Sequence, residues 1–228
     1  MLDWRAEWQE RFGRTEPKII CVGLNYKDHA VEGGVKNLPT SPILFAKFST
    51  ALCNDGDPIL MPDGIGHVDS EAELTVIVGR ECHKVSADDA LDFVHGYTCG
   101  NDVSARDAQF GDRQWFRGKT YDSFCPVGPR IVPVAELGEA GDLRVIQRLN
   151  GEVLQDGSTS QLIFGVRELV AFTSHVLTLQ PGDLILTGTP AGVGVFREPK
   201  ISMKPGDVAE VEVEGIGVLR NPVEATEA

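Results

Sequence analysis

The sequence predicts a β-rich α+β fold, and three observations point to it. Short apolar or alternating runs typical of strands recur along the chain, most clearly over 70–78 and 184–187. Clusters of Gly, Pro and Asp separate these runs, and the 228 residues include 25 Gly and 13 Pro. Few segments show the three-to-four-residue apolar spacing of a helix. Many short strands with few helices indicate the α+β class.

Composition and charge exclude several classes of protein. The chain carries a formal net charge of −13 and no cluster of Lys and Arg, so we expect no nucleic-acid partner. It has no apolar run near the roughly 18 residues of a membrane span and no apolar leader. We therefore expect no membrane association, no signal peptide and a cytoplasmic location. Five scattered cysteines without a C-x-x-C pair indicate free thiols in a reducing compartment.

The first elements follow from the spacing of apolar residues. Trp4, Trp8 and Phe12 recur every four positions, which predicts a short amphipathic helix. Apolar runs predict strands over 18–23 and 42–48, and the loop between them holds a short helical turn ended by two glycines. The second strand contains a lysine, Lys47. It is either a site residue or an edge lysine that buries only its stem, and both interpretations stand.

Further along the chain, capping and turn residues mark the elements. Ser86, followed by two acidic residues, is an N-cap pattern and predicts a helix that ends at His95-Gly96. A strand over 97–102 and a short helix over 104–111 are expected next. The residues around Lys119 are too mixed to predict a regular element. Asn150-Gly151, a preferred type I′ turn pair, centres a hairpin over 142–157.

The C-terminal third alternates helix and strand signals. Apolar spacing through Leu169, Val170, Phe172, Val176 and Leu177 predicts a helix with one buried face, and we expect a structural role for His175 within it. A strand over 184–187 follows, turns at Pro205-Gly206-Asp207 and at Glu214-Gly215 mark a closing hairpin, and a frayed tail is expected from Pro222 onward.

Two glutamates in the strand over 70–78 carry the strongest chemical signal. Period-2 alternation places Glu71 and Glu73 side by side on one face. Adjacent carboxylates repel each other, so the pair costs energy unless both are solvated or share a cation. A second strand ends at Asp102, and three acidic oxygen ligands without His or Cys suit Mg²⁺ or Mn²⁺. From the pattern alone, a solvated strand face remains the alternative.

Three other features have both a functional and a plain interpretation. His29 and Glu32 lie three apart and can touch on a helix, although they could equally be two exposed polar residues. Arg106 by itself indicates a salt bridge with Asp102 or Asp107. The glycine-rich stretch 188–194 lacks the spacing of nucleotide-binding loops, and its glycines would let backbone N–H groups approach an anion.

A series of short motifs runs through the chain in one order. They are Val22-Gly23-Leu24-Asn25-Tyr26, Asp28-His29-Ala30, Glu71-Ala72-Glu73, Asn101-Asp102-Val103-Ser104-Ala105-Arg106-Asp107, Gly118-Lys119, Phe124-Cys125-Pro126-Val127-Gly128-Pro129, and Thr187-Gly188-Thr189-Pro190-Ala191-Gly192-Val193-Gly194. From about 18 to 222 the series resembles the fumarylacetoacetate hydrolase superfamily. It is most similar to the short members of the acylpyruvase and oxaloacetate decarboxylase type. We therefore expect a short N-terminal segment over 1–17 and one catalytic domain over 18–228, without the extra N-terminal domain of larger members.

The resemblance implies a mixed β-roll, a homodimer and a set of site residues. It implies that Mg²⁺ or Mn²⁺ is held by Glu71, Glu73 and Asp102 and binds a small 2-oxo acid. It implies that His29, oriented by Glu32 in a lid, activates a water molecule, while Lys119 stabilises an enolate oxygen. The substrate-binding residues that it implies are Arg106, Gln109, Gly188 and Thr189.

The expected reaction is metal-dependent hydrolysis of a C–C bond in a 3-acylpyruvate, which yields pyruvate and a carboxylic acid. Oxaloacetate decarboxylation and isomerisation of a 2-hydroxyhepta-2,4-diene-1,7-dioate pass through a similar enolate and remain alternatives. The H-x-x-E pair favours hydrolysis, because the other two reactions need no activated water. A non-catalytic metal or carboxylate binder is a more remote alternative. Two departures from the family concern specificity: Leu24, where some relatives have Arg, and the bulky, charged stretch 110–117.

Overall fold

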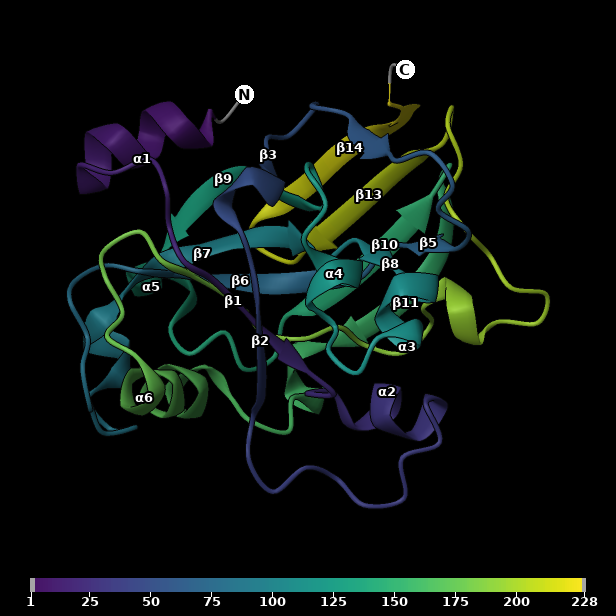
Figure 1. Cartoon of the computed structure of the whole chain (residues 1–228). Helices are drawn as coiled ribbons and strands as arrows, with labels where there is room; N and C mark the ends of the chain where they lie inside the picture. The colour runs from purple at the N-terminus through teal and green to yellow at the C-terminus, as the bar shows by residue number, and fades with distance from the viewer. Residues whose placement is uncertain (1–2, 227–228) are drawn as a thin grey trace.

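A seven-stranded mixed sheet forms the centre of the structure, a computed structural model that describes residues 3–226 (Figure 1). In spatial order its strands are β2 (Ile43–Lys47), β1 (Ile19–Gly23), β12 (Leu184–Leu186), β6 (Ala72–Val78), β7 (Val94–Asn101), β9 (Cys125–Pro133) and β3 (Leu52–Cys53). The β1–β12 and β3–β9 pairs are parallel, and the other pairs are antiparallel.

A second sheet packs against the first. Its order is β11 (Glu152–Ser158), β10 (Arg144–Leu149), β13 (Val208–Val213), β14 (Gly217–Ala225) and β4 (Ile59–Met61), and a separate pair joins β5 (Val68–Asp69) to β8 (Ser104–Ala105). The helices are α1 (Trp4–Phe12), α2 (Lys27–Glu32), α3 (Arg106–Gly111), α4 (Phe116–Lys119), α5 (Val134–Leu137) and α6 (Val166–Val176). Figure 1 shows α2, α3 and α4 grouped at one side, away from α1 and α6. The predicted β-rich α+β fold is confirmed.

The central sheet is covered on both faces. One face packs against α6 and the second sheet, through residues such as Leu74, Leu169 and Val211. The other face packs against α1, whose Trp4 and Trp8 join Ile19, Leu184 and other apolar side chains. All seven residues of β6 are therefore buried, so its alternation separates two interior environments and not core from solvent.

Trp8 should contribute strongly to stability. It is 1% exposed, and its indole Nε1 donates a hydrogen bond of 2.6 Å to the Gly182 carbonyl oxygen. We expect Trp8→Ala to lower the free energy of unfolding by about 3–5 kcal/mol, measured by denaturant titration. Gln9→Ala, on the exposed face of α1, is the control and should change it by no more than about 0.5 kcal/mol. Equal effects of the two variants would contradict a core role for α1.

Most predicted elements are confirmed, including α1, β1, β2, β6 and β12. The hairpin β10–β11 turns at Asn150 and Gly151, whose φ angles of 53° and 82° are those of a type I′ turn. The β13–β14 hairpin and α6 also lie where they were expected. Within α6, however, Val176 is 62% exposed instead of buried, and His175 is exposed beside it.

The helix predicted from Ser86 is wrong. The structure has only the 3₁₀ turn η2 (Ala90–Phe93), and β7 begins at Val94. The Ser86 hydroxyl accepts a 3.2 Å hydrogen bond from Asp89 N–H, so the capping signal is real but serves a turn. Val94 pairs with Val78 in the central sheet, and this tertiary pairing overrides the local preference.

Three further predictions need correction. Residues 222–225 are not frayed, because Val223 pairs in parallel with Ile59 within β14 and β4. Residues 227–228 lie outside the described part of the chain. The short helix expected from 104 begins at Arg106, after β8, and Lys119 belongs to a regular element, α4.

The five cysteines are buried free thiols, as the sequence predicts. Burial raises the pKa of the Cys125 thiol to about 12. Within residues 3–226, no helix is both long and apolar enough to cross a membrane.

Candidate metal centre and active site

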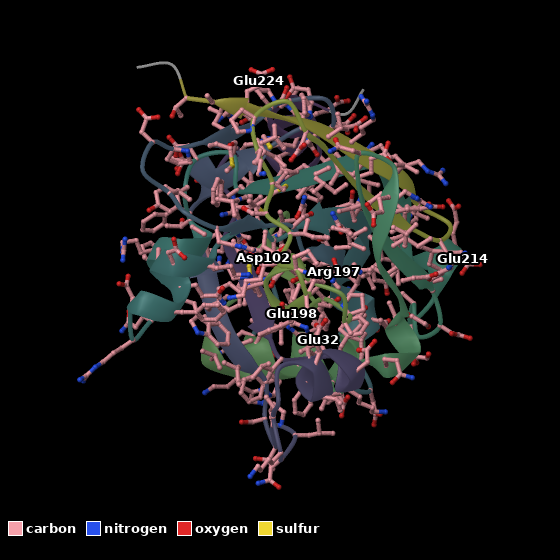
Figure 2. The ribbon with its side chains drawn as sticks, turned by 90° about the vertical axis from the view of Figure 1, so that its right-hand side faces the viewer. Glu32, Asp102, Arg197, Glu198, Glu214 and Glu224 are labelled. Atoms are coloured by element: carbon pink, nitrogen blue, oxygen red, sulfur yellow. The ribbon has the colours of Figure 1, made fainter. Side chains whose placement is uncertain are left out.

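Three buried carboxylates meet at one end of β6 and β7. Glu71, Glu73 and Asp102 are 5%, 1% and 0% exposed, and one oxygen of each lies within 4.8 Å of the others. The register explains the meeting. Ala72 pairs with Asn101, and the Asp102 N–H donates a 2.9 Å hydrogen bond to the Glu71 carbonyl oxygen. In Figure 2, Asp102 lies toward the middle of the molecule, and Glu32, the last residue of α2, lies below it. The solvated-face alternative is therefore wrong.

Two cations compensate Glu71 on opposite sides. Lys119 Nζ lies 2.6 Å from Glu71 Oε2 and 2.7 Å from Asp102 Oδ2, while Arg106 Nη2 lies 2.7 Å from Glu71 Oε1. Burial alone would raise the pKa of Glu71, but the charges of Lys119 and Arg106 outweigh it and lower that pKa below its usual range. Burial would lower the pKa of Lys119, and the carboxylates of Asp102 and Glu71 raise it instead. Lys119 is therefore a charged ammonium group at neutral pH.

Glu73, in contrast, has no paired lysine or arginine in the described part of the chain. It accepts a 2.7 Å hydrogen bond from the Gly188 N–H, whereas the lysines and the arginine of the site pair with its neighbours. Burial raises the pKa of Glu73 well above its usual value, and repulsion from Asp102 and Glu71 raises it further. A cation beside the three oxygens would offset the cost of keeping Glu73 ionised in the interior. Three hard oxygen donors with one under-compensated carboxylate therefore fit a divalent ion such as Mg²⁺ or Mn²⁺.

Lys47 is fully part of the interior and not an edge lysine. Its ammonium group lies 2.6 Å from Asp102 Oδ1. It also donates hydrogen bonds to the carbonyl oxygens of Val103, Phe124 and Lys119, the first two at 3.0 and 2.7 Å. Lys47 thus holds both Asp102 and the backbone that carries Lys119. The sequence signal for it was a single lysine inside an otherwise apolar strand.

The helix α2 places a histidine–glutamate pair against the glycine-rich loop. His29 Nδ1 lies 3.1 Å from Glu32 Oε2, and Glu32 Oε1 accepts a 2.9 Å hydrogen bond from the Gly192 N–H. The His29 ring also lies 6.0 Å from the Phe196 ring, and His29 is 8% exposed. When Nδ1 carries the proton shared with Glu32, Nε2 is free to accept a proton from a substrate or a water molecule.

Arg106 is held by a residue that the sequence did not single out. Asp69 Oδ2 accepts hydrogen bonds of 3.1 and 2.9 Å from Arg106 Nε and Nη2, and a third donor of Arg106 binds Gln109 Oε1 at 2.9 Å. Asp69 also accepts the N–H groups of Gly194 and Val195 at 2.9 and 3.0 Å. It therefore ties the glycine-rich loop to the acidic cluster through Arg106.

The loop at Gly188 and Thr189 is also committed to internal contacts. The Thr189 hydroxyl donates to the Ala72 carbonyl oxygen at 2.9 Å and accepts from Gln155 Nε2 at 2.7 Å. Its single proton is thereby used within the protein. Gly188 has φ +101°, and a Cβ there would lie 2.9 Å from Asn25 Cβ, so glycine is required. The buried Gln155 was not singled out from the sequence.

These groups open onto one cavity of about 230 Å³. Its lining residues are Val22, Gly23, Leu24, His29, Gly33, Val35, Phe45, Glu71, Glu73, Asp102, Arg106, Gln109, Phe110, Trp115, Lys119, Thr189 and Phe196. The structure thus brings together nine of the sequence-predicted site residues at the cavity wall or directly behind it, and Glu32 behind His29. Lys47, Asp69 and Gln155 complete the site from behind this lining.

Fold and site together define a class of protein. The family model for the C-terminal domain of fumarylacetoacetate (FAA) hydrolase matches residues 18–224, so the chain belongs to the fumarylacetoacetate hydrolase family. This confirms the resemblance read from the motifs. The chain is 45% identical over 212 residues to oxaloacetate tautomerase FAHD2A, mitochondrial, of Bos taurus, covering 92% of this chain and 67% of the bovine protein. It thus spans about two thirds of that relative's length.

Solved structures of similar proteins agree. The 5-carboxymethyl-2-hydroxymuconate delta-isomerase of Mycobacterium smegmatis is 44% identical with a TM-score of 0.82, covering 92% of this chain and 80% of that one. The 2-hydroxyhepta-2,4-diene-1,7-dioate isomerase of Mycobacterium marinum is 44% identical with a TM-score of 0.81, covering 92% and 75%. This chain is therefore similar to tautomerases and isomerases of one enzyme family.

The lid expected around His29 can be tested by hydrogen exchange. Only His29 and Ala30 of α2 are buried, and Val31 is 74% exposed, so few apolar contacts hold the helix. We expect the amides of 25–36 to exchange more slowly when Mn²⁺ and oxalate are added than with Mn²⁺ alone. The amides of β6 serve as the internal control and should not change. Unaltered exchange over 25–36 would argue against a lid.

Proposed function

We propose that this chain is a divalent-metal-dependent enzyme that moves a proton at the carbon next to the keto group of a 2-oxo acid. Keto–enol tautomerisation is the simplest such reaction. The observation that carries the proposal is that His29, Lys119 and the three-carboxylate cluster line one cavity. The names of the similar proteins, an oxaloacetate tautomerase and two isomerases, support the same class of reaction.

Each group has a distinct part in this chemistry. A divalent ion held by the carboxylates would supply Lewis-acid polarisation of the keto group. The ammonium group of Lys119 provides a hydrogen-bond donor for the developing enolate oxygen. In the keto-to-enol direction His29 Nε2 takes the proton from carbon while the enolate oxygen gains a proton from solvent, and in the reverse direction His29 delivers the proton to carbon as the oxygen loses one. Glu32 keeps the ring in the required tautomer and orientation. Lys47 contributes indirectly by fixing Asp102.

Hydrolysis of a C–C bond in a 3-acylpyruvate is the second candidate. One observation favours it: both oxygens of Glu32 are engaged, by His29 and by Gly192 N–H, so Glu32 orients the His29 ring at the cavity when α2 lies against the glycine-rich loop. A base held in this way could deprotonate a water molecule as well as a carbon. Oxaloacetate decarboxylation requires no such base, and a non-catalytic binder would require neither His29 nor Lys119. A homodimer and a cytoplasmic location stay predictions.

A small substrate panel tests the proposal. Metal-stripped protein would be reloaded with Mg²⁺ or Mn²⁺, and loss of enol absorbance followed for oxaloacetate and for a 3-acylpyruvate. We expect metal-dependent acceleration of enol–keto exchange, with chelator abolishing it and either ion restoring it. Pyruvate release from the 3-acylpyruvate would establish the hydrolase instead. Metal and oxalate binding without turnover of any member would leave the non-catalytic binder as the explanation.

A further inference from the structure

One wall of the cavity is aromatic and rigidly built. Phe45 of β2 and Trp115, which precedes α4, pack edge to face with ring centroids 5.5 Å apart and an interplanar angle of 77°. The Trp115 ring lies directly on the backbone of Gly23, where an added Cβ would come within 2.2 Å of Cζ3. Glycine at this position is what lets the indole pack closely against β1. The wall is therefore held in place before any substrate arrives.

This aromatic wall lies beside Lys119, the lysine that we expect to contact the enolate oxygen. Lys119 Nζ lies 5.3 Å from the centre of the Phe45 ring, while the same ammonium group contacts Glu71 and Asp102. A substituent on a substrate whose enolate oxygen meets Lys119 thus starts beside Phe45. Leu24 also lines the cavity. Contact with these side chains would remove apolar surface of the substituent from water, which favours binding.

The charges around the cavity also favour a substituent that is apolar. Among residues 3–226, the cationic side chains that line it apart from His29 are Arg106 and Lys119. Arg106 is paired with Asp69 and Glu71, and Lys119 with Glu71 and Asp102. A carboxylate at the far end of a substituent held inside this cavity would therefore lie beside aromatic rings, because Arg113 lines the adjoining hollow with Phe45 and Trp115 and not the cavity itself. Burying such a charge is costly.

Resting on the proposed function, we infer that the site takes 2-oxo acids whose substituent is apolar and planar, bound against Phe45 and Trp115. Aryl and unsaturated hydrocarbon tails have this chemistry. The same acids with a carboxylate at the end of the tail bind less well. Trp115 is thus a residue that determines specificity. Oxaloacetate does not test the inference, because its second carboxylate is attached directly to the reacting carbon.

A matched series of arylpyruvates provides the test. Pyruvate, 3-phenylpyruvate and 3-(4-carboxyphenyl)pyruvate would be titrated into the Mn²⁺-loaded protein by calorimetry, and enol–keto exchange of the two aryl acids followed by absorbance. We expect phenylpyruvate to bind at least about tenfold more tightly than pyruvate and than the carboxyphenyl acid. Equal affinities within the series would overturn the inference.

Variants test whether Trp115 and Leu24 determine this preference. Trp115→Ala should reduce the ratio of phenylpyruvate to pyruvate affinity by about tenfold or more. Leu24→Arg should raise the affinity for the carboxyphenyl acid, and it adds no new backbone constraint because Leu24 already has φ 52°. Phe48→Ala is the control: this ring is 62% exposed, packs on Phe116 and lies outside the cavity. An unchanged ratio in Trp115→Ala, or equal loss in Phe48→Ala, would contradict the inference.

The outcomes separate the inference from the proposed function. Tight, Trp115-dependent binding of phenylpyruvate without enol–keto exchange would sustain the aromatic wall and refute the tautomerase. Exchange of both aryl acids at similar rates, indifferent to Trp115, would sustain the tautomerase and refute the wall. Unfolding of Trp115→Ala, recognised by its melting temperature, leaves the gain expected for Leu24→Arg to decide.

Discussion

Replacing Glu73 by Gln should lower the affinity for Mn²⁺ by at least about 100-fold while leaving the metal-free protein as stable as before, or more so. Loss of a group behind a metal ligand costs about 10–100-fold in affinity, and loss of a ligand should cost no less. In the metal-free protein, burial and the charges of Asp102 and Glu71 raise the pKa of Glu73. Glutamine of the same shape removes this repulsion and can still accept the Gly188 N–H.

The pH dependence of this effect has a defined sign. A carboxyl group whose pKa is raised in the folded state destabilises that state once the unfolded chain ionises, above about pH 4.3. The stability gained by Glu73→Gln should therefore appear near neutral pH and vanish below about pH 4. Thermal melts of metal-stripped protein at the two pH values would measure it.

Glu71→Gln provides the matched contrast. This change leaves the buried cations Lys119 and Arg106 without their shared carboxylate partner. Breaking a buried pair in this way typically costs about 3–5 kcal/mol. We therefore expect metal-free Glu71→Gln to melt well below the wild type, whereas Glu73→Gln does not. If both variants lose stability equally, the three carboxylates do not divide into two compensated by cations and one awaiting a metal.

The second large effect concerns His29. His29→Ala should reduce both enol–keto exchange and any 3-acylpyruvate cleavage by about 10²–10⁴-fold, because each requires proton transfer by a positioned base. Oxaloacetate decarboxylation, which needs only stabilisation of the enolate, should keep most of its rate. The three rates would be measured under saturating Mn²⁺, so that a change in metal affinity does not enter.

Two further variants serve as a control and as a comparison for His29→Ala. His175→Ala, an exposed histidine on α6 outside the cavity, is the control and should change none of the three rates. Lys119→Ala should depress all three together, since it removes a donor that every enolate uses. If His29→Ala impairs decarboxylation as severely as exchange, His29 acts on structure or metal binding and not as a base.

The acidic cluster could be predicted because it depends on two local patterns. Alternation along β6 puts Glu71 and Glu73 on one face, and a strand that ends at Asp102 is its natural antiparallel neighbour. The H-x-x-E spacing similarly predicted that His29 and Glu32 touch, and the structure places them 3.1 Å apart. For these two pairs, neighbours along the chain become neighbours in space through a fixed backbone period, whereas Asp102 joins Glu71 and Glu73 only through the pairing of β7 with β6.

Local signals failed where tertiary pairing opposed them. The capping residues at Ser86 favour a helix, yet Val94 is needed in the sheet beside Val78. The tail from Pro222 has the polar composition of a frayed end, but Val223 finds a parallel partner in Ile59. The local sequence of each segment does not indicate which distant strand it pairs with.

By itself, the sequence determined the fold class, the family and the kinds of groups that meet in the site. Only the tertiary structure decided how those groups are paired. It placed Lys47 on Asp102, 55 positions away, and Arg106 on Asp69, 37 positions away. It also turned Phe45 and Trp115 into one wall beside Lys119. Such contacts depend on how strands are ordered in a sheet, and chain order does not specify that arrangement through any local period.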